Sequence, residues 1–174
     1  MEKLYRSKYG AYPFLSDAPE DYRCDFELLT DEIASLTGLL QSMVSDEQIR
    51  EELGFVCGII YHINPSLRTH ISVTQDELMK LEGILRRIRE ELGDSVKGFV
   101  LPMGCQSAAL SHVLRVKCKA VVRLLYKHNH QGHKVDDLLF DFTNLLSGYF
   151  FHVALKLNLL EGIKEITYTS RNYK

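Results

Sequence analysis

Several features that mark particular classes of protein are missing from these 174 residues. The four cysteines, at positions 24, 57, 105 and 118, form no Cys-x-x-Cys pair, so the sequence indicates neither a zinc-finger pattern nor a disulfide framework. We interpret them as reduced, mostly packed thiols, which are typical of a cytoplasmic protein. Low-complexity segments and internal repeats are also missing.

Long hydrophobic runs and an excess of positive charge are missing as well. No apolar run approaches the roughly 20 residues needed to span a bilayer, and the first 14 residues lack the apolar core of a secretory signal. The formal net charge is −2, which argues against a basic surface for nucleic acid or an anionic membrane. We therefore expect no nucleic-acid partner, no membrane and a cytoplasmic location.

The composition, with 45% hydrophobic and 25% charged residues, is that of a soluble globular protein. The length suits one domain with a substantial core. Tyrosine, proline and glycine interrupt any helical period in residues 1–24, so we expect an irregular segment that packs on the domain or on a neighbouring subunit. Residues 25–162 are expected to form the domain, and residues 163–174 a tail that favours extended structure.

Apolar residues at helical spacing predict five helices. Their approximate ranges are residues 25–44, 46–63, 74–92, 107–128 and 135–160. In the first helix the predicted core stripe includes Leu28, Ile33, Leu40 and Met43. Thr74 and Glu77 form a capping-box pattern at the start of the third helix. Five helices with short polar links predict an all-α, up-and-down five-helix bundle with little or no strand.

Two charged or metal-ligating clusters each allow two interpretations. His128, His130 and His133 fall within six residues and could form a metal site. The glycine between them and the absence of a nearby cysteine or carboxylate cluster favour a turn between helices. Arg86, Arg87 and Arg89 could contact phosphate, but a solvated helix face is the commoner role for such a run.

The stretch from Phe99 to Arg123 has the features of a binding site. It begins with Phe-Val-Leu-Pro-Met-Gly, in which proline ends an extended segment and Gly104 allows a turn. A helix follows, and Ser107 is the expected cap near its start. Arg115 and Lys119 are four residues apart, so they lie on one side of this helix. Two such cations suit a polyphosphate or a facing carboxylate.

This stretch resembles the PduO-type ATP:cob(I)alamin adenosyltransferases. That family has a Phe-Ile/Val-Leu-Pro-x-Gly turn, a run of small residues ending in His, and Arg three residues later; here these are Phe99 to Gly104, His112 and Arg115. A second motif of the family appears from Asn144 to Phe151, and a third begins at Thr30-Asp31-Glu32. The three motifs span roughly residues 25 to 162.

The resemblance implies a homotrimer with sites between subunits, which transfers the 5′-deoxyadenosyl group of ATP to cob(I)alamin and uses Mg²⁺ with the nucleotide. It implies that Arg115 meets Asp31 of a neighbouring subunit, and that both act in catalysis. For an isolated helix Asp, a solvated carboxylate is the alternative. Lys119 and Asn144 match ATP-contacting positions of the family. No metal ion bound by the protein itself is expected.

The corrinoid and the N-terminal cations complete the predicted site. Phe99, His112 and Tyr149 are the predicted corrinoid neighbours, although an aromatic at helical spacing such as Tyr149 also suits a core position. The family's glycine-rich phosphate loop and its Arg-Ala-Glu-Arg segment are missing here. An active enzyme would use Arg6, Lys8 and Arg123 in their place. A bundle that binds nucleotide or corrinoid without catalysis, and a scaffold subunit of a cobalamin-dependent system, are the alternatives.

Overall fold

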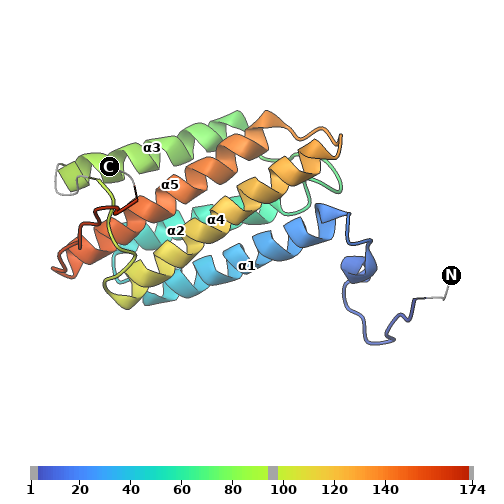
Figure 1. Cartoon of the computed structure of the whole chain (residues 1–174). Helices are drawn as coiled ribbons and strands as arrows, with labels where there is room; N and C mark the ends of the chain where they lie inside the picture. The colour runs from blue at the N-terminus through green and yellow to red at the C-terminus, as the bar shows by residue number, and fades with distance from the viewer. Residues whose placement is uncertain (1–3, 94–97, 173–174) are drawn as a thin grey trace.

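The computed structural model describes residues 4–93 and 98–172; the ends of both predicted terminal segments lie outside this range. Within it the chain forms a bundle of five α-helices (Figure 1). These are α1 (Tyr22–Met43), α2 (Glu47–Ile63), α3 (Gln75–Leu92), α4 (Gln106–His130) and α5 (Asp137–Leu160), preceded by a short 3-10 helix, η1 (Pro13–Ser16). The only strand-like pairing in the described part is an isolated bridge between Val100 and Thr167. The predicted all-α bundle is confirmed.

Local sequence signals set most helix ends. Thr74 and Glu77 form the predicted capping box, in which the Thr74 hydroxyl accepts from the Glu77 amide at 3.3 Å and the Glu77 carboxylate accepts from the Thr74 amide at 2.8 Å. Gly93 ends α3 with a φ of +53°, a conformation that glycine adopts without steric cost. Asn64 is the C-cap residue of α2 and directly precedes Pro65.

The start of α4 differs from the prediction. Cys105, not Ser107, is the N-cap residue, and its side chain makes no capping hydrogen bond. Ser107 lies in the first turn and is buried. The Cys105 amide donates instead to the Asn158 side chain of α5 at 3.0 Å. The start of α4 is therefore held by a tertiary hydrogen bond, whereas each of the other four helices begins with a side-chain cap.

The most apolar of the helices is α5. α4 packs against α5 and α1, α3 packs against α5, and α2 packs against α1. α5 is long and apolar enough to span a membrane, with a mean hydropathy of 1.3 in its best window. Its Phe142, Tyr149, Phe150, Val153 and Ala154 are completely buried in the bundle, so we interpret α5 as the core helix of a soluble protein.

The outer faces of α1 and α4 carry more apolar surface than predicted. Leu28 and Met43, placed in the core by periodicity, are 47% and 37% exposed, whereas Ile33 and Leu40 are buried as expected. On α4, Val113 and Val116 are also exposed. These side chains lie on the outside of the single chain, where a second copy can cover them.

The two terminal segments lie in different places. The N-terminal segment leaves the bundle at the start of α1, and the C-terminal tail runs beside the loop that precedes α4 (Figure 1). Backbone hydrogen bonds of 2.8 Å join Leu101 to Ile166 and Tyr168 to Phe99. The tail therefore adopts the extended structure that its composition favours, and it holds the loop in place.

Candidate functional site

The loop from Phe99 to Cys105 is held from beneath by one buried side chain. Asn158 is 1% exposed; its amide nitrogen donates to the Met103 carbonyl at 3.0 Å, and its oxygen accepts from the Cys105 amide. The Phe99 side chain is 79% exposed. The loop thus presents an aromatic ring to solvent from a fixed backbone, an arrangement suited to covering an apolar planar ligand.

The register of α4 against α5 is set by three contacts. The Ser111 hydroxyl donates to the Phe150 carbonyl at 2.7 Å, and the Ser147 hydroxyl donates to the Arg115 carbonyl at 3.2 Å. Further along, the ring centroids of Tyr126 and Phe140 are 4.6 Å apart. The two helices therefore run antiparallel, so residues with higher numbers on α4 lie opposite residues with lower numbers on α5.

This register places the predicted ATP-binding residues Lys119 and Asn144 at the same height along the α4–α5 helix pair. Asn144 lies four residues after Phe140 and three before Ser147, so it shares their α4-facing side of α5. Lys119 lies four residues after Arg115 on α4, opposite Asn144 in the register. Lys119 and Asn144 are both exposed. We call His112, Arg115, Lys119, Asn144 and Phe151 the α4–α5 face.

Polar atoms on the α4–α5 face are buried without partners. His112 is 3% exposed, and neither of its ring nitrogens has a hydrogen-bond partner among the described residues. The same holds for Nε of Arg115. Both side chains lie near Phe151, at 6.1 Å between ring centroids for His112 and 6.0 Å from ring to guanidinium for Arg115. Unpartnered buried polar atoms are costly, so this face is where a further hydrogen-bonding partner would lower the free energy most.

Burial also decides the protonation of His112. Desolvation, and next to it the charge of Arg115, lowers the pKa of His112 to about 4. The ring is therefore neutral at pH 7, whereas in the unfolded chain its pKa returns to about 6.5. Since the unfolded state then binds more protons between these values, folding is least costly for His112 above pH 6.5, and the free energy of unfolding falls as the pH drops from 6.5 toward 4.

We expect the free energy of unfolding to fall by about 2–3 kcal/mol from this residue alone between pH 7 and pH 4. Urea denaturation of wild type and of His112→Phe across this range measures it, because the variant should lose that part of the pH dependence. His70→Gln, which changes an exposed histidine, is the control and should follow wild type. Parallel curves for wild type and His112→Phe would contradict the assignment.

Asp31 and Arg115 contact different elements within the chain: Asp31 bonds to α2, and Arg115 lies over Phe151 of α5. Asp31 is exposed on α1, and its carboxylate accepts from the Tyr61 hydroxyl of α2 at 3.0 Å. It lines a pocket of about 290 Å³ together with Tyr12 and Leu15 of the N-terminal segment and Leu28 of α1. Within one chain the structure therefore does not bring Asp31 and Arg115 together, and a pairing between them requires two copies.

The remaining predicted residues are scattered. Arg6 and Lys8 are exposed in the N-terminal segment, and Arg123 is exposed on α4, two turns beyond Arg115. Tyr149 is 0% exposed, and its hydroxyl has no partner among the described residues. In the single chain this ring is part of the core, which is the second of the two interpretations given above, and a role for Tyr149 beside the corrinoid stays a prediction.

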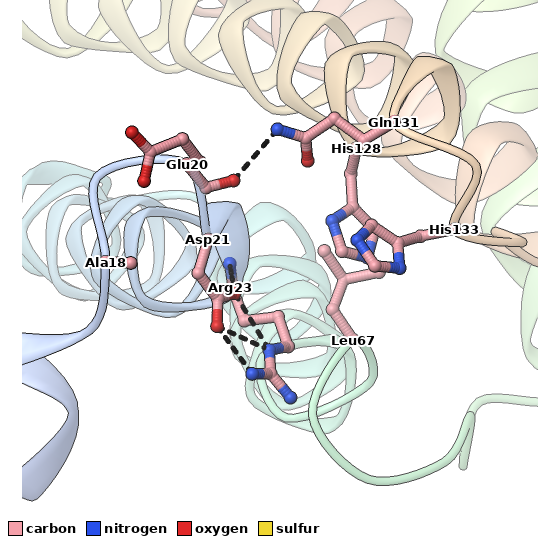
Figure 2. A pocket seen from close by; sticks show the side chains of 8 residues that line it. All are labelled: Ala18, Glu20, Asp21, Arg23, Leu67, His128, Gln131 and His133. Atoms are coloured by element: carbon pink, nitrogen blue, oxygen red, sulfur yellow. Dashed lines mark hydrogen bonds and ion pairs between the residues drawn. The ribbon is translucent and has the colours of Figure 1, made fainter.

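The histidine cluster spans the end of α4 and the turn that follows it, so the helix runs slightly further than predicted. α4 ends at His130, and Gly132 follows with a φ of +89°. His128 and His133 stack with ring centroids 4.4 Å apart at the wall of a 550 Å³ pocket, opposite the hydrogen-bonded pair Asp21 and Arg23 (Figure 2). The described residues contain no group of three or more His, Cys, Asp or Glu placed to hold a metal ion.

Two residues with structural roles near the site were not predicted from the sequence: Asn158, which supports the loop before α4, and Arg68, which pairs with Glu27 and Asp17. Asn158 is a polar residue in an apolar stretch of α5, four positions after the buried Ala154, and that position was a usable signal for a buried polar contact. Arg68 lies between α2 and α3, where the sequence shows no periodicity. It pairs with Glu27 and Asp17 from other parts of the chain, and no local pattern marks such a partnership.

Comparison with known proteins agrees with this architecture. Three PduO-type ATP:corrinoid adenosyltransferase variants from Lactobacillus reuteri share the fold. One, complexed with cobalamin and ATP, has 23% identity and a TM-score of 0.76 and covers 88% of this chain and 86% of its own. A second such complex has 22% identity and a TM-score of 0.75, with coverage of 86% and 87%. The third, an arginine-to-lysine variant complexed with ATP, has 23% identity and a TM-score of 0.75, with coverage of 86% and 88%.

None of the curated proteins matches this chain. The sequence does match a protein family, described as cobalamin adenosyltransferase, over residues 21–157. That range runs from the N-cap of α1 almost to the end of α5 and so includes the α4–α5 face and Asp31. The chain belongs to the cobalamin adenosyltransferase family.

Proposed function

We propose that this protein is an ATP:corrinoid adenosyltransferase. In the reaction, the Co(I) lone pair of cob(I)alamin attacks C5′ of ATP, the C5′–O bond breaks, and triphosphate leaves with that electron pair. The observation that carries the proposal is the α4–α5 face, where two cations and an amide lie at adjacent levels on one side of a helix pair. The family match over most of the bundle supports it.

The nucleotide is assigned to the α4–α5 face. Arg115 and Lys119 supply charge to the phosphates, and Asn144 supplies an amide for hydrogen bonds. Arg123, Arg6 and Lys8 are further cations within the proposed site. A relative that is an arginine-to-lysine variant is complexed with ATP, so an arginine-to-lysine exchange in this fold is compatible with bound nucleotide. Mg²⁺ would arrive on the phosphates of ATP and neutralise part of their charge.

The corrinoid is assigned to the end of the bundle where Phe99 lies. A phenyl ring that is mostly exposed in the single chain gains about 1.5–3 kcal/mol when an apolar surface covers it fully. His112 and Phe151 lie deeper, on the adjoining α4–α5 face. The protein's task is to position the two substrates and to exclude water, because the nucleophile is the cobalt itself.

The site is proposed to form between copies of a homotrimer in the cytoplasm. Exposed Leu28 on α1 and exposed Val113 and Val116 on α4 give each chain apolar surface for another copy. A neighbour's Asp31 would then give Nε of Arg115 the hydrogen-bond partner that it does not have among the described residues. All four cysteines are free, which suits a reducing compartment.

The test is direct. Purified protein is mixed with ATP, Mg²⁺ and chemically reduced cobalamin, and the absorbance of adenosylcobalamin is followed under anaerobic conditions. We expect product formation that depends on both ATP and protein. No product would reject the enzyme. Titrations with ATP and with cobalamin would then distinguish a binding protein from a scaffold, for which both ligands would leave the thermal midpoint unchanged.

A further inference from the structure

Arg68 holds together three parts of the chain that are distant in sequence. Its side chain is only 13% exposed. The guanidinium donates to both carboxylate oxygens of Glu27 on α1, at 2.6 and 2.8 Å, and to Asp17 at 2.9 Å. It also lies over the ring of Phe14, 3.6 Å from the centroid. A bidentate pairing with a carboxylate, combined with stacking of the cation on an aromatic ring, requires the planar guanidinium of arginine and cannot be made by lysine.

The network attaches the N-terminal segment to the bundle by polar contacts. η1 buries none of its residues, and Leu15 within it is 61% exposed. The Tyr12 hydroxyl donates to Glu27, and burial together with this carboxylate raises the pKa of Tyr12 to about 12. The hold on residues 12–17 therefore depends on Arg68 and Glu27, because apolar burial contributes little there.

The attached segment borders the pocket that holds Asp31. Tyr12 and Leu15 form one wall of this pocket, and Asp31 and Tyr61 form another. Beyond the attachment, residues 4–10 are exposed and contain a turn in which the Gly10 amide donates to the Ser7 carbonyl at 3.2 Å. Arg6 and Lys8 flank the start of this turn. Both cations are thus joined to the bundle through residues 12–17.

We propose that Arg68 is a positioning residue of the nucleotide site. By fixing residues 12–17 on α1, it shapes the wall beside Asp31 and presents Arg6 and Lys8 to the phosphates of ATP. It touches neither substrate. This inference rests on the proposed function, since it takes ATP as the ligand.

Arg68→Ala tests the proposal with two readouts. Chymotrypsin should cleave wild type only at exposed sites such as Tyr5 and Tyr9, and should reach Tyr12 and Phe14 in the variant. The KM for ATP should rise about tenfold with kcat within about twofold, because only the fraction of molecules with a docked segment binds ATP well. Arg68→Lys should show an intermediate KM. Phe14→Ala, which leaves every buried charge paired, replaces Arg68→Ala if that variant does not fold.

Arg87→Ala is the matched control, since Arg87 also pairs with two carboxylates, Glu52 and Glu91, on the α3 side of the bundle. It should lower stability and leave the KM for ATP unchanged. Continued protection of Tyr12 and Phe14 in Arg68→Ala, an unchanged KM, or an equal rise in Arg87→Ala would each overturn the proposal. If wild type forms no adenosylcobalamin, the proposed function fails. The role of Arg68 is then decided by the dissociation constant for ATP, compared between wild type, Arg68→Ala and Arg87→Ala in place of KM.

Discussion

Replacing Arg115 with alanine is expected to lower adenosylcobalamin formation at least about hundredfold and to dissociate the proposed trimer. Its Nε is buried without a hydrogen-bond partner among the described residues, and a neighbour's Asp31 is the proposed partner. Removing one member of a buried ion pair costs about 3–5 kcal/mol, because the other charge stays buried and unpaired. Anaerobic product assays and sedimentation velocity measure the two effects.

Lys117→Ala is the control for Arg115→Ala. Lys117 lies two residues further along α4 and pairs with Glu32 of its own chain at 2.7 Å, so its loss should change neither assembly nor rate. Asp31→Asn should match Arg115→Ala, and the double variant should be no worse than either single change. An unchanged oligomer with unchanged ATP affinity in Arg115→Ala would contradict the role given to Arg115.

Replacing Gly104 with alanine is expected to destabilise the protein by about 3–5 kcal/mol, as the sum of backbone strain and broken buried hydrogen bonds. The φ of Gly104 is +136°, and a Cβ there would lie 1.9 Å from Oδ1 of Asn158. Asn158 would have to move, which breaks its bonds to Met103 and Cys105. Urea denaturation measures the loss of stability.

The Gly104 variant should also weaken corrinoid binding, because the loop that carries Phe99 loses its attachment. A raised KM for cobalamin with a smaller change in the KM for ATP is the expected pattern. Gly83→Ala is the control: Gly83 lies within α3, and a Cβ there has no neighbour closer than 4.0 Å. It should stabilise the helix by about 0.5–1 kcal/mol. Wild-type stability in Gly104→Ala would contradict the close packing described for this turn.

The helices were predictable because their causes are local. The capping box at Thr74, the stop at Gly93 and the apolar period of α5 are all properties of residues within a few positions of each other. The start of α4 was not predictable in the same way. Ser107 is a good capping residue by type, but the N-cap is Cys105, and its amide donates to Asn158, 53 positions further along the chain.

In the candidate site, too, some features followed from local spacing and others from the packing of the helices. Arg115 and Lys119 share a helix side by spacing alone, and Asn144 could be placed near them only once the register of α4 against α5 was known. Periodicity put Leu28 in the core because it identifies apolar positions without showing what covers them. Tyr149 was ambiguous for the same reason, and only the packed structure showed that its ring is completely buried within the single chain.

The amino-acid sequence by itself determined the five helices, most of their ends, the family motifs and the identities of the charged residues on α4. Those features depend on backbone geometry and on neighbours within one or two turns. Only the tertiary structure decided that Asp31 and Arg115 have different contacts within one chain, that Asn158 supports the loop before α4, and that Arg68 holds the N-terminal segment. Such pairings depend on distances between remote parts of the chain, which are set when the helices pack and are not encoded in any local pattern.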